Sequence, residues 1–293
     1  MMLRLVLALS LLSFASAPAE ARLVEAVASF TVLADMVHQV GGDRVHVTSL
    51  VGVNGDPHAY EPSPDDAKRL KSADVVFVSG LGLEGWMDRL IKASGFKGRP
   101  AVASTGLQPL RMQEDGRQVA DPHAWNSAAN GIVYVGNIVA ALSAADPDGA
   151  AAYRANGDRY VSELRQLDAE TRQRIGAIPA ARRRVLTSHE AFGYFAAAYG
   201  VTFLSPVGLS TEGEASARAL AGLIRQIKAE KVQVYFLENS NDPRLVKQVA
   251  AATGAKPGGM LFVESLSNPD GPAPTYAAMF KGNVDKLVAA MER

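Results

Sequence analysis

The 293-residue chain contains no cysteine and has a formal net charge of zero. Without cysteine, the chain is expected to have neither a disulfide nor a lipid anchor on a cysteine. The balance of thirty basic and thirty acidic residues argues against nucleic-acid binding, because nucleic-acid-binding proteins normally carry a basic surplus. Histidine is scarce, with five in the whole chain. The position of each histidine is therefore informative.

Residues 1–21 have the pattern of a secretory signal peptide. Arg4 supplies a positive start, Leu5 to Phe14 are mostly apolar, and Ala19-Glu20-Ala21 is a plausible cleavage site. The apolar stretch is shorter than the roughly 20 residues that a spanning helix needs; a buried N-terminal helix is the alternative. No other apolar run is expected to cross a membrane. The pattern predicts an exported protein, located in the periplasm of a double-membraned bacterium.

Short β-branched runs alternate with helical patterns along the rest of the chain, which predicts an α/β fold. The expected strands are 23–29, 44–51, 73–80, 100–104, 183–188, 201–204, 232–238 and 259–265. Between the two halves, apolar residues recur at helical spacing over 146–179, which predicts one long, rigid linking helix. We therefore expect a signal peptide at 1–21, an N-terminal lobe at 22–145, the helix at 146–179 and a C-terminal lobe at 180–293. Each lobe is expected to be Rossmann-like.

The tetrapeptide Asp-Pro-His-Ala occurs twice, followed by an aromatic residue each time, and presents His58 and His123. His58 follows an expected strand, and ligands of open α/β sheets bind beyond the carboxyl ends of strands. His189 directly follows the expected strand 183–188, and Glu264 comes directly after the apolar run Leu261-Phe262-Val263. Three imidazoles and one carboxylate would complete a four-coordinate zinc shell. From the residues alone, the alternative of ordinary loop histidines bonded to backbone stays open.

Other polar residues are candidates for a supporting role around this site. Asp56 and Asp121, from the two repeated motifs, could each accept the second N–H of a ligand imidazole. Asn239 ends an expected strand that faces the site, which makes a contact behind the ligands reasonable.

Six segments carry a resemblance to a known family. They are GVNGDPHAYEPSPDDAKRL, DPHAWNS, LTSHEAFGYFAAAYGV, STEGEASARALAGLIRQIKAEKV, ENSNDPRLVKQVAAATGA and LFVESLSNPDGPAPTYAAMFKGNVDKL. In this order, over roughly 23–290, they resemble the periplasmic zinc- and manganese-binding proteins of ABC importers, the cluster A-I solute-binding family. The resemblance implies two α/β lobes joined by one long helix, with a metal buried between them. It also implies delivery of the metal to an inner-membrane permease powered by a cytoplasmic ATPase.

The resemblance places the family's ligand positions on His58, His123, His189 and Glu264. Manganese-preferring members carry a glutamate in place of His189, and imidazole suits zinc while carboxylate-rich shells suit manganese. We therefore expect Zn²⁺, with Mn²⁺ as the alternative. The fourth position is usually aspartate in similar sequences, so Asp270 is the fallback ligand if Glu264 is not used.

Two further expectations concern partners and activity. Many zinc-binding relatives carry a histidine-rich loop between the first two ligands, but no histidine lies between His58 and His123. Uptake is then expected to rely on the main site or on a separate periplasmic metallochaperone.

A secreted zinc hydrolase, with Glu264 as general base, is the main competing class of function. An adhesin is a third class. Four protein ligands leave no place for an activated water, so we expect a monomeric transport protein and no enzyme.

Overall fold

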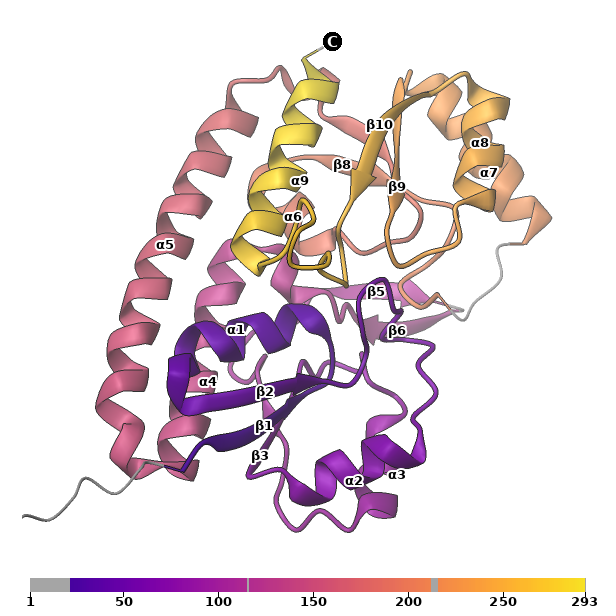
Figure 1. The fold of residues 1–293 in the computed structure, drawn as a ribbon. Coiled ribbons are helices and arrows are strands. Elements are labelled where there is room, and N and C mark those ends of the chain that lie inside the picture. The colour runs from indigo at the N-terminus through magenta and orange to yellow at the C-terminus, as the bar shows by residue number, and fades with distance from the viewer. Residues whose placement is uncertain (1–21, 115, 212–215, 293) are drawn as a thin grey trace, which may run out of the picture.

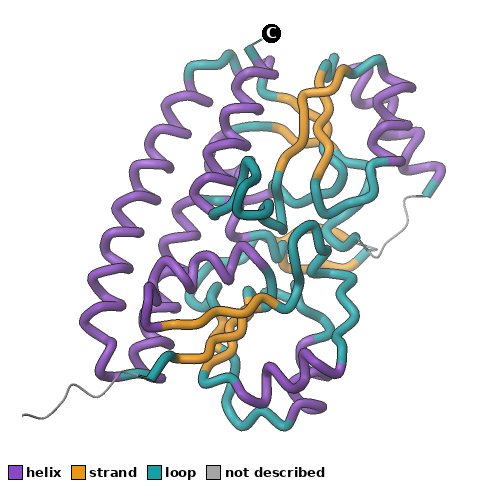
Figure 2. The backbone as a smooth tube through the Cα atoms, viewed as in Figure 1, coloured by secondary structure: helices purple, strands orange, loops and turns teal. Residues whose placement is uncertain are grey.

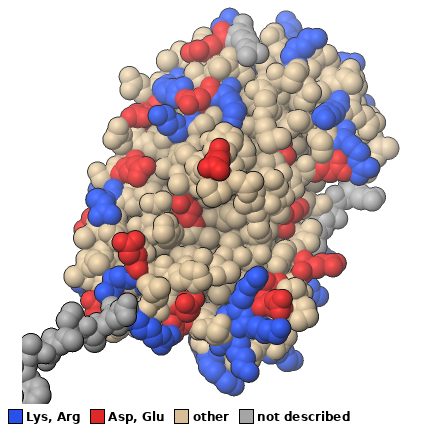
Figure 3. All heavy atoms as spheres, in the orientation of Figure 1, with Lys and Arg blue, Asp and Glu red and all other residues tan. Residues whose placement is uncertain are grey.

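The computed structural model describes residues 22–114, 116–211 and 216–292. The predicted signal peptide lies outside these residues. The chain forms two α/β lobes, each built on a four-stranded parallel sheet (Figure 1). This confirms the fold class that the alternating sequence pattern predicts. Basic and acidic side chains are interspersed over the face shown in Figure 3, as the balanced composition requires.

The N-terminal sheet has the strand order β2-β1-β3-β4. Its strands are β1 (Val24–Ala28), β2 (Val45–Ser49), β3 (Val75–Val78) and β4 (Ala101–Val102). Its helices are α1 (Thr31–Gly41), α2 (Pro64–Ser72) and α3 (Met87–Ser94), with a 3-10 turn at Gly42–Arg44. Helix α2 begins where Ser63 and Asp66 form a reciprocal capping box with Pro64 at the first helical position.

The C-terminal sheet has the order β10-β9-β7-β8. Its strands are β7 (Arg184–Leu186), β8 (Thr202–Leu204), β9 (Val234–Glu238) and β10 (Lys256–Leu261). Its helices are α6 (Gly193–Tyr199), α7 (Ala217–Ala229), α8 (Arg244–Thr253) and α9 (Tyr276–Met291), with a 3-10 turn at Ala180–Arg182. Strand β10 ends earlier than the 259–265 pattern predicts, so Glu264 lies in the loop beyond it. The sequence spacing of Thr211 and Glu214 is that of a capping box, but Glu214 lies outside the described residues. The side chain of Ser216 caps α7 by accepting from the backbone N–H of Ala219.

Helix α5 (Ala150–Gly176) runs beside both lobes (Figures 1 and 2). A 3-10 turn at Pro147–Gly149 precedes it. Its apolar stripe is buried against α1, α4 and α9, which belong to different halves of the chain. Because α5 packs on both lobes along its length, it stiffens their relative placement more than a flexible linker would.

A pair of strands and a helix that follow the last expected strand of the first half were not predicted. Strands β5 (Arg111–Glu114) and β6 (Arg117–Ala120) form an antiparallel pair, and a 3-10 turn follows at Ala124–Asn126. Helix α4 (Ala128–Ala145) is long and apolar enough, by length and composition, to cross a membrane. The expectation that no such run exists beyond the signal peptide is therefore wrong. In this fold α4 packs against α1 and α5, and its residues Tyr134, Val135, Ile138 and Leu142 are buried.

The hydrophobic core is continuous across the two lobes. Phe30 and Trp125 pack with ring centroids 4.8 Å apart, and Phe195 lies 5.8 Å from Phe280. These rings belong to one cluster that draws on both sheets. A second, smaller cluster lies between β7, β9, α7 and α8. The shared core places the loops of the two lobes against each other, and the candidate site lies at this junction.

Candidate metal centre

The two Asp-Pro-His motifs fold into the same local turn. The backbone N–H of His58 donates to Oδ1 of Asp56 at 2.8 Å, and that of His123 donates to Oδ1 of Asp121 at 2.9 Å. An aspartate that accepts from the residue two positions later forms a compact turn that presents the following side chain. The repeated sequence therefore produces a repeated geometry, and both turns face the same centre.

Four side chains converge at this centre from loops of both lobes. Oε1 of Glu264 lies 2.8 Å from Nε2 of His58, 3.2 Å from Nε2 of His123 and 3.4 Å from Nε2 of His189. Nε2 of His58 and Nε2 of His123 are 3.1 Å apart, and all four atoms lie within 4.8 Å of one another. Ligands held at zinc distances in a tetrahedron are about 3.3 Å apart. The donor atoms are thus spaced as ligands of one ion.

This cluster is almost completely withdrawn from solvent. The side chains of His123, His189 and Glu264 are at most 1% exposed, and that of His58 is 6% exposed. Nε2 of His189 makes no hydrogen bond to any described residue. A buried nitrogen without a partner is costly. A bound cation would satisfy it, so the donor set fits a metal ion.

The electrostatics of the metal-free cluster follow from its burial and its close pairs. Burial alone would lower the pKa of His189, but Glu238 and Glu264 outweigh it and hold that pKa well above 6.5. The pKa of His123 is also raised, because hydrogen bonds to Asp121 and Glu264 outweigh desolvation. Burial would raise the pKa of Glu264, yet His189 and His58 hold it well below 4.5. Without metal, the positive charge of protonated imidazoles therefore balances the negative charge of the Glu264 carboxylate.

In His123 and His189, the ring nitrogen that points away from the centre, Nδ1, contacts a carboxylate. Oδ1 of Asp121 lies 2.9 Å from Nδ1 of His123, which is the contact expected for that aspartate. Nδ1 of His189 contacts Oε2 of Glu238 in the same way. Such partners fix the tautomer and aim Nε2 at the centre. The sequence reasoning missed Glu238. It could have been found, because it ends β9 in phase with the buried Val234 and Phe236.

Other candidate residues lie elsewhere. Asp56 does not reach the ring of His58; its Oδ2 accepts a hydrogen bond from Thr211 Oγ1 at 2.6 Å. Asn239 donates to Oδ1 of Asn54, in the loop before His58, at 3.1 Å. It supports that loop and does not touch the four ligands. Asp270 is exposed and is not part of the cluster.

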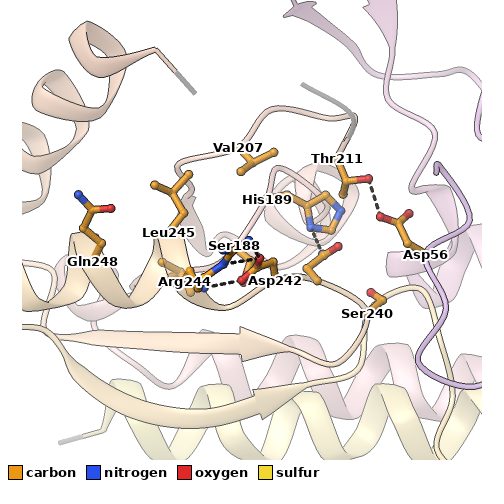
Figure 4. A pocket seen from close by; sticks show the side chains of 12 residues that line it. Asp56, Ser188, His189, Val207, Thr211, Ser240, Asp242, Arg244, Leu245 and Gln248 are labelled. Carbon is orange, nitrogen blue, oxygen red and sulfur yellow. Dashed lines mark hydrogen bonds and ion pairs between the residues drawn. The ribbon is translucent and has the colours of Figure 1, made fainter. Parts of the chain in front are cut away.

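A cavity of about 620 Å³ opens beside His189. Ser188, Asn241 and Arg244 line its C-terminal-lobe side, and Asp56 and Thr211 meet across it (Figure 4). The close-up shows the ring of His189 next to the Thr211–Asp56 hydrogen bond. The cavity is therefore lined by residues of both lobes and reaches His189 of the cluster.

Comparisons with known proteins agree with this architecture. A model of the family described as zinc-uptake complex component A, periplasmic (ZnuA), matches residues 26–290. Iron-binding protein YfeA of Yersinia pestis is 34% identical over 271 residues, covering 91% of this chain and 86% of that protein. The manganese ABC transporter substrate-binding lipoprotein PsaA of Streptococcus mitis is 32% identical over 280 residues, covering 92% and 90%.

Solved structures agree as well. The periplasmic zinc binding protein TroA of Treponema pallidum matches with a TM-score of 0.85 and 29% identity, covering 92% of this chain and 99% of that one. A manganese-bound periplasmic metal binding protein of Candidatus Liberibacter asiaticus matches with a TM-score of 0.80 and 31% identity, covering 91% and 98%.

Two parallel-sheet lobes that enclose three imidazoles and a carboxylate define a substrate-binding protein for a metal ion. The family match covers nearly all of the chain after the predicted signal peptide. The chain belongs to the ZnuA family, the metal-binding components of ABC importers that act outside the cytoplasm, and it is a transport protein rather than an enzyme. The relatives are named for iron, manganese or zinc, so family membership leaves the metal open.

Proposed function

We propose that this protein captures Zn²⁺ in the periplasm and delivers it to the permease of an ABC importer. The observation that carries the proposal is the convergence of three Nε2 atoms and one carboxylate oxygen within 4.8 Å. Imidazole nitrogen is a preferred ligand of zinc, whereas manganese prefers shells rich in oxygen. His58, His123, His189 and Glu264 are the proposed ligands.

The carboxylate of Glu264 supports a four-coordinate shell. Its Oε1 faces the three imidazoles, while its Oε2 accepts a hydrogen bond from Ser240 Oγ at 3.3 Å. With one oxygen engaged elsewhere, Glu264 is set to bind through a single atom, as tetrahedral zinc requires. Mn²⁺ is the alternative cargo, because relatives at about one-third identity are named for manganese or iron.

The proposal extends to how the protein is arranged and used. Residues 22–145 and 180–293 form the two lobes, and residues 146–179 join them. The mature protein is a monomer, is released by cleavage after residue 21 and is not lipid-anchored. Some relatives are named lipoproteins, whereas this chain contains no cysteine. A periplasmic metallochaperone remains part of the proposal, because no histidine lies between His58 and His123 to collect metal.

Calorimetric titration of chelator-treated protein with zinc tests the site directly. We expect one zinc ion per chain for the wild type and a large loss of affinity for Glu264→Ala. Asp270→Ala is the matched control, since Asp270 is exposed and outside the cluster. A loss of affinity in Asp270→Ala with none in Glu264→Ala would overturn the assignment of the fourth ligand.

A further inference from the structure

Trp86 holds the loop of His58 from inside the N-terminal lobe. Its indole N–H donates to the backbone oxygen of Pro57, the residue directly before His58, at 2.8 Å. The contact is buried, and Trp86 is 3% exposed. The ring of Tyr60, two residues after His58, packs against the same indole with ring centroids 5.0 Å apart. One indole therefore contacts the chain on both sides of this proposed ligand.

The turn that carries this indole is fixed to the sheet. Trp86 directly precedes α3, and Glu84 lies two residues before it. Oε1 of Glu84 accepts from the hydroxyl of Ser29 and from the backbone N–H of Ser79, each at 2.6 Å, and Oε2 accepts from the backbone N–H of Gly80 at 3.1 Å. Ser29 and Ser79 directly follow β1 and β3, the two central strands of the sheet. The indole is therefore attached to the rigid centre of its lobe.

His58 depends on such a contact more than the other two imidazoles do. Nδ1 of His123 and Nδ1 of His189 each contact a carboxylate. Among the described residues, the one carboxylate that pairs with His58 is that of Glu264, and it does so at Nε2, on the metal side of the ring. His58 is also the most exposed of the four side chains, at 6%. Because no carboxylate holds its Nδ1, the hold on its backbone decides where Nε2 lies.

The fourth ligand position has a matching contact. The indole N–H of Trp125 donates to the backbone oxygen of Val263, the residue directly before Glu264, at 2.7 Å. The chain contains two tryptophans, and each donates to the peptide that precedes a proposed ligand. The four ligands thus divide into two whose rings are held by carboxylates and two whose preceding peptide is held by an indole.

We propose that Trp86 is a positioning residue of the metal site: its indole N–H fixes the place of His58 through the carbonyl of Pro57. A phenylalanine at 86 would fill most of the same apolar space but would leave this buried oxygen without its donor, which is costly. The site therefore requires the N–H of residue 86 as well as the bulk of its ring. This inference rests on the proposed function, in which His58 is a zinc ligand.

A double-mutant cycle with the mature protein tests whether Trp86 acts through His58. The variants are Trp86→Phe, His58→Ala and the two combined, each stripped with a chelator and titrated with Zn²⁺. With His58 present, Trp86→Phe should lower the zinc affinity by about five- to tenfold, the effect expected for one lost buried hydrogen bond. In the His58→Ala background it should cause no further loss, because only independent sites have additive effects. An equal loss in both backgrounds would overturn the proposal.

Asn156→Ala is the matched control for lost stability. The side chain of Asn156 also donates to a backbone oxygen, that of Val40, at 2.9 Å, but this contact joins α5 to α1 and includes none of the four ligands. Both Asn156→Ala and Trp86→Phe should have a lower Tm, and of the two Trp86→Phe alone should bind zinc more weakly. A lower Tm with unchanged zinc affinity in Trp86→Phe would give Trp86 a purely structural role and overturn the proposal.

The cycle also separates this inference from the proposed function. Unchanged zinc affinity in His58→Ala would remove His58 from the ligand set, and the role of Trp86 would fall with it. Weaker zinc binding in His58→Ala with unchanged binding in Trp86→Phe would overturn the inference alone.

Hydrogen exchange of the indole N–H groups in the wild type needs no variant to fold. Coupling between two sites is reciprocal, so zinc bound at His58 should strengthen the hydrogen bond from Trp86 to Pro57. The NMR signal of Trp86 is identified by its proximity to the ring of Tyr60. Its exchange with solvent should be at least about fivefold slower in the zinc-loaded protein than in the metal-free protein. Equal exchange rates in the two forms would contradict the proposal.

Discussion

The indole N–H of Trp125 donates to the backbone oxygen of Val263 at 2.7 Å, which joins the loop of His123 directly to the loop of Glu264. The hydroxyl of Tyr276 donates in turn to the backbone oxygen of Trp125 at 2.6 Å. Both contacts are buried. Two proposed ligands from opposite halves of the chain are therefore held close together by the fold itself. Such preorganisation reduces the ordering cost of binding an ion.

Replacement of His189 by alanine tests the contribution of the third imidazole. Removing one of four ligands should lower zinc affinity by at least about 100-fold, because the remaining three leave the ion incompletely coordinated. The metal-free variant should unfold as cooperatively as the metal-free wild type. His46→Ala is the control, since His46 is exposed and pairs with Glu25 at 2.7 Å, away from the site. A well-folded His189→Ala protein with unchanged zinc affinity would exclude His189 as a ligand.

Zinc binding should strengthen as pH rises. In the metal-free protein the pKa values of His123 and His189 lie above their usual value, so zinc must displace protons near neutral pH. Each displaced proton changes the apparent affinity by about tenfold per pH unit. The measurement is the zinc dissociation constant between about pH 6 and 8, buffered by a chelator of known affinity.

Thermal stability gives an independent check on the same groups. Protonated His123 and His189 stabilise the metal-free fold below pH 6.5, and this contribution is lost as pH rises through their raised pKa values. Zinc-loaded protein does not depend on those protons. The increase in Tm caused by zinc should therefore grow with pH. An increase that stays constant from about pH 6 to 8 would show that these imidazoles do not exchange protons for metal.

Gly193→Ala should weaken the site through Asp121. A Cβ on Gly193 would collide with Oδ2 of Asp121, the aspartate whose other oxygen contacts His123. Overpacking of this kind costs about 1–3 kcal/mol of stability, and displacing the carboxylate should lower zinc affinity by about tenfold. Gly136→Ala is the control, because a Cβ there meets nothing within 4 Å. Urea unfolding of both variants measures the loss of stability, and zinc titration measures the loss of affinity. Unchanged zinc affinity in Gly193→Ala would show that the position of Asp121 does not affect metal binding.

Thr211→Val should speed zinc release. Thr211 holds Asp56, which in turn accepts the backbone N–H of His58, so it ties that loop to the C-terminal lobe. Losing a hydrogen bond worth about 0.5–1.5 kcal/mol should raise the dissociation rate by roughly two- to tenfold. Stopped-flow chelator competition measures the rate. Thr105→Val is the control: the hydroxyl of Thr105 donates to the backbone oxygen of Val102 within its own turn, so its loss should leave the dissociation rate unchanged. Equal dissociation rates in the wild type and both variants would show that the Thr211–Asp56 contact does not control zinc release.

The positions of the four central side chains could be anticipated from local signals. The repeated Asp-Pro-His motif is visible in the sequence. His189 lies just beyond one expected strand, and Glu264 lies near the end of another. The resemblance to a known family then grouped these residues. The structure brings them together, although their role as ligands is a proposal that the measurements above test.

The missed features depend on contacts across the fold. Helix α4 is apolar on nearly every side, because its buried face packs on other helices and its exposed face carries small residues such as Ala129, Gly136 and Ala140. Its sequence therefore lacks the periodicity of a surface helix. Strands β5 and β6 are mostly polar and only four residues long each, which hides the alternation expected of a strand. The alternation of β9 predicts that Glu238 is buried, but its contact with His189 joins two strands far apart in the sequence.

The most direct test of zinc capture is competition between metals. Chelator-stripped protein is given equal, limiting amounts of Zn²⁺ and Mn²⁺, and bound metal is counted by native mass spectrometry. The three-imidazole site predicts almost only zinc, at one ion per chain. Predominant manganese would contradict the account, because it would mean that Glu264 and its surroundings outweigh the three histidines.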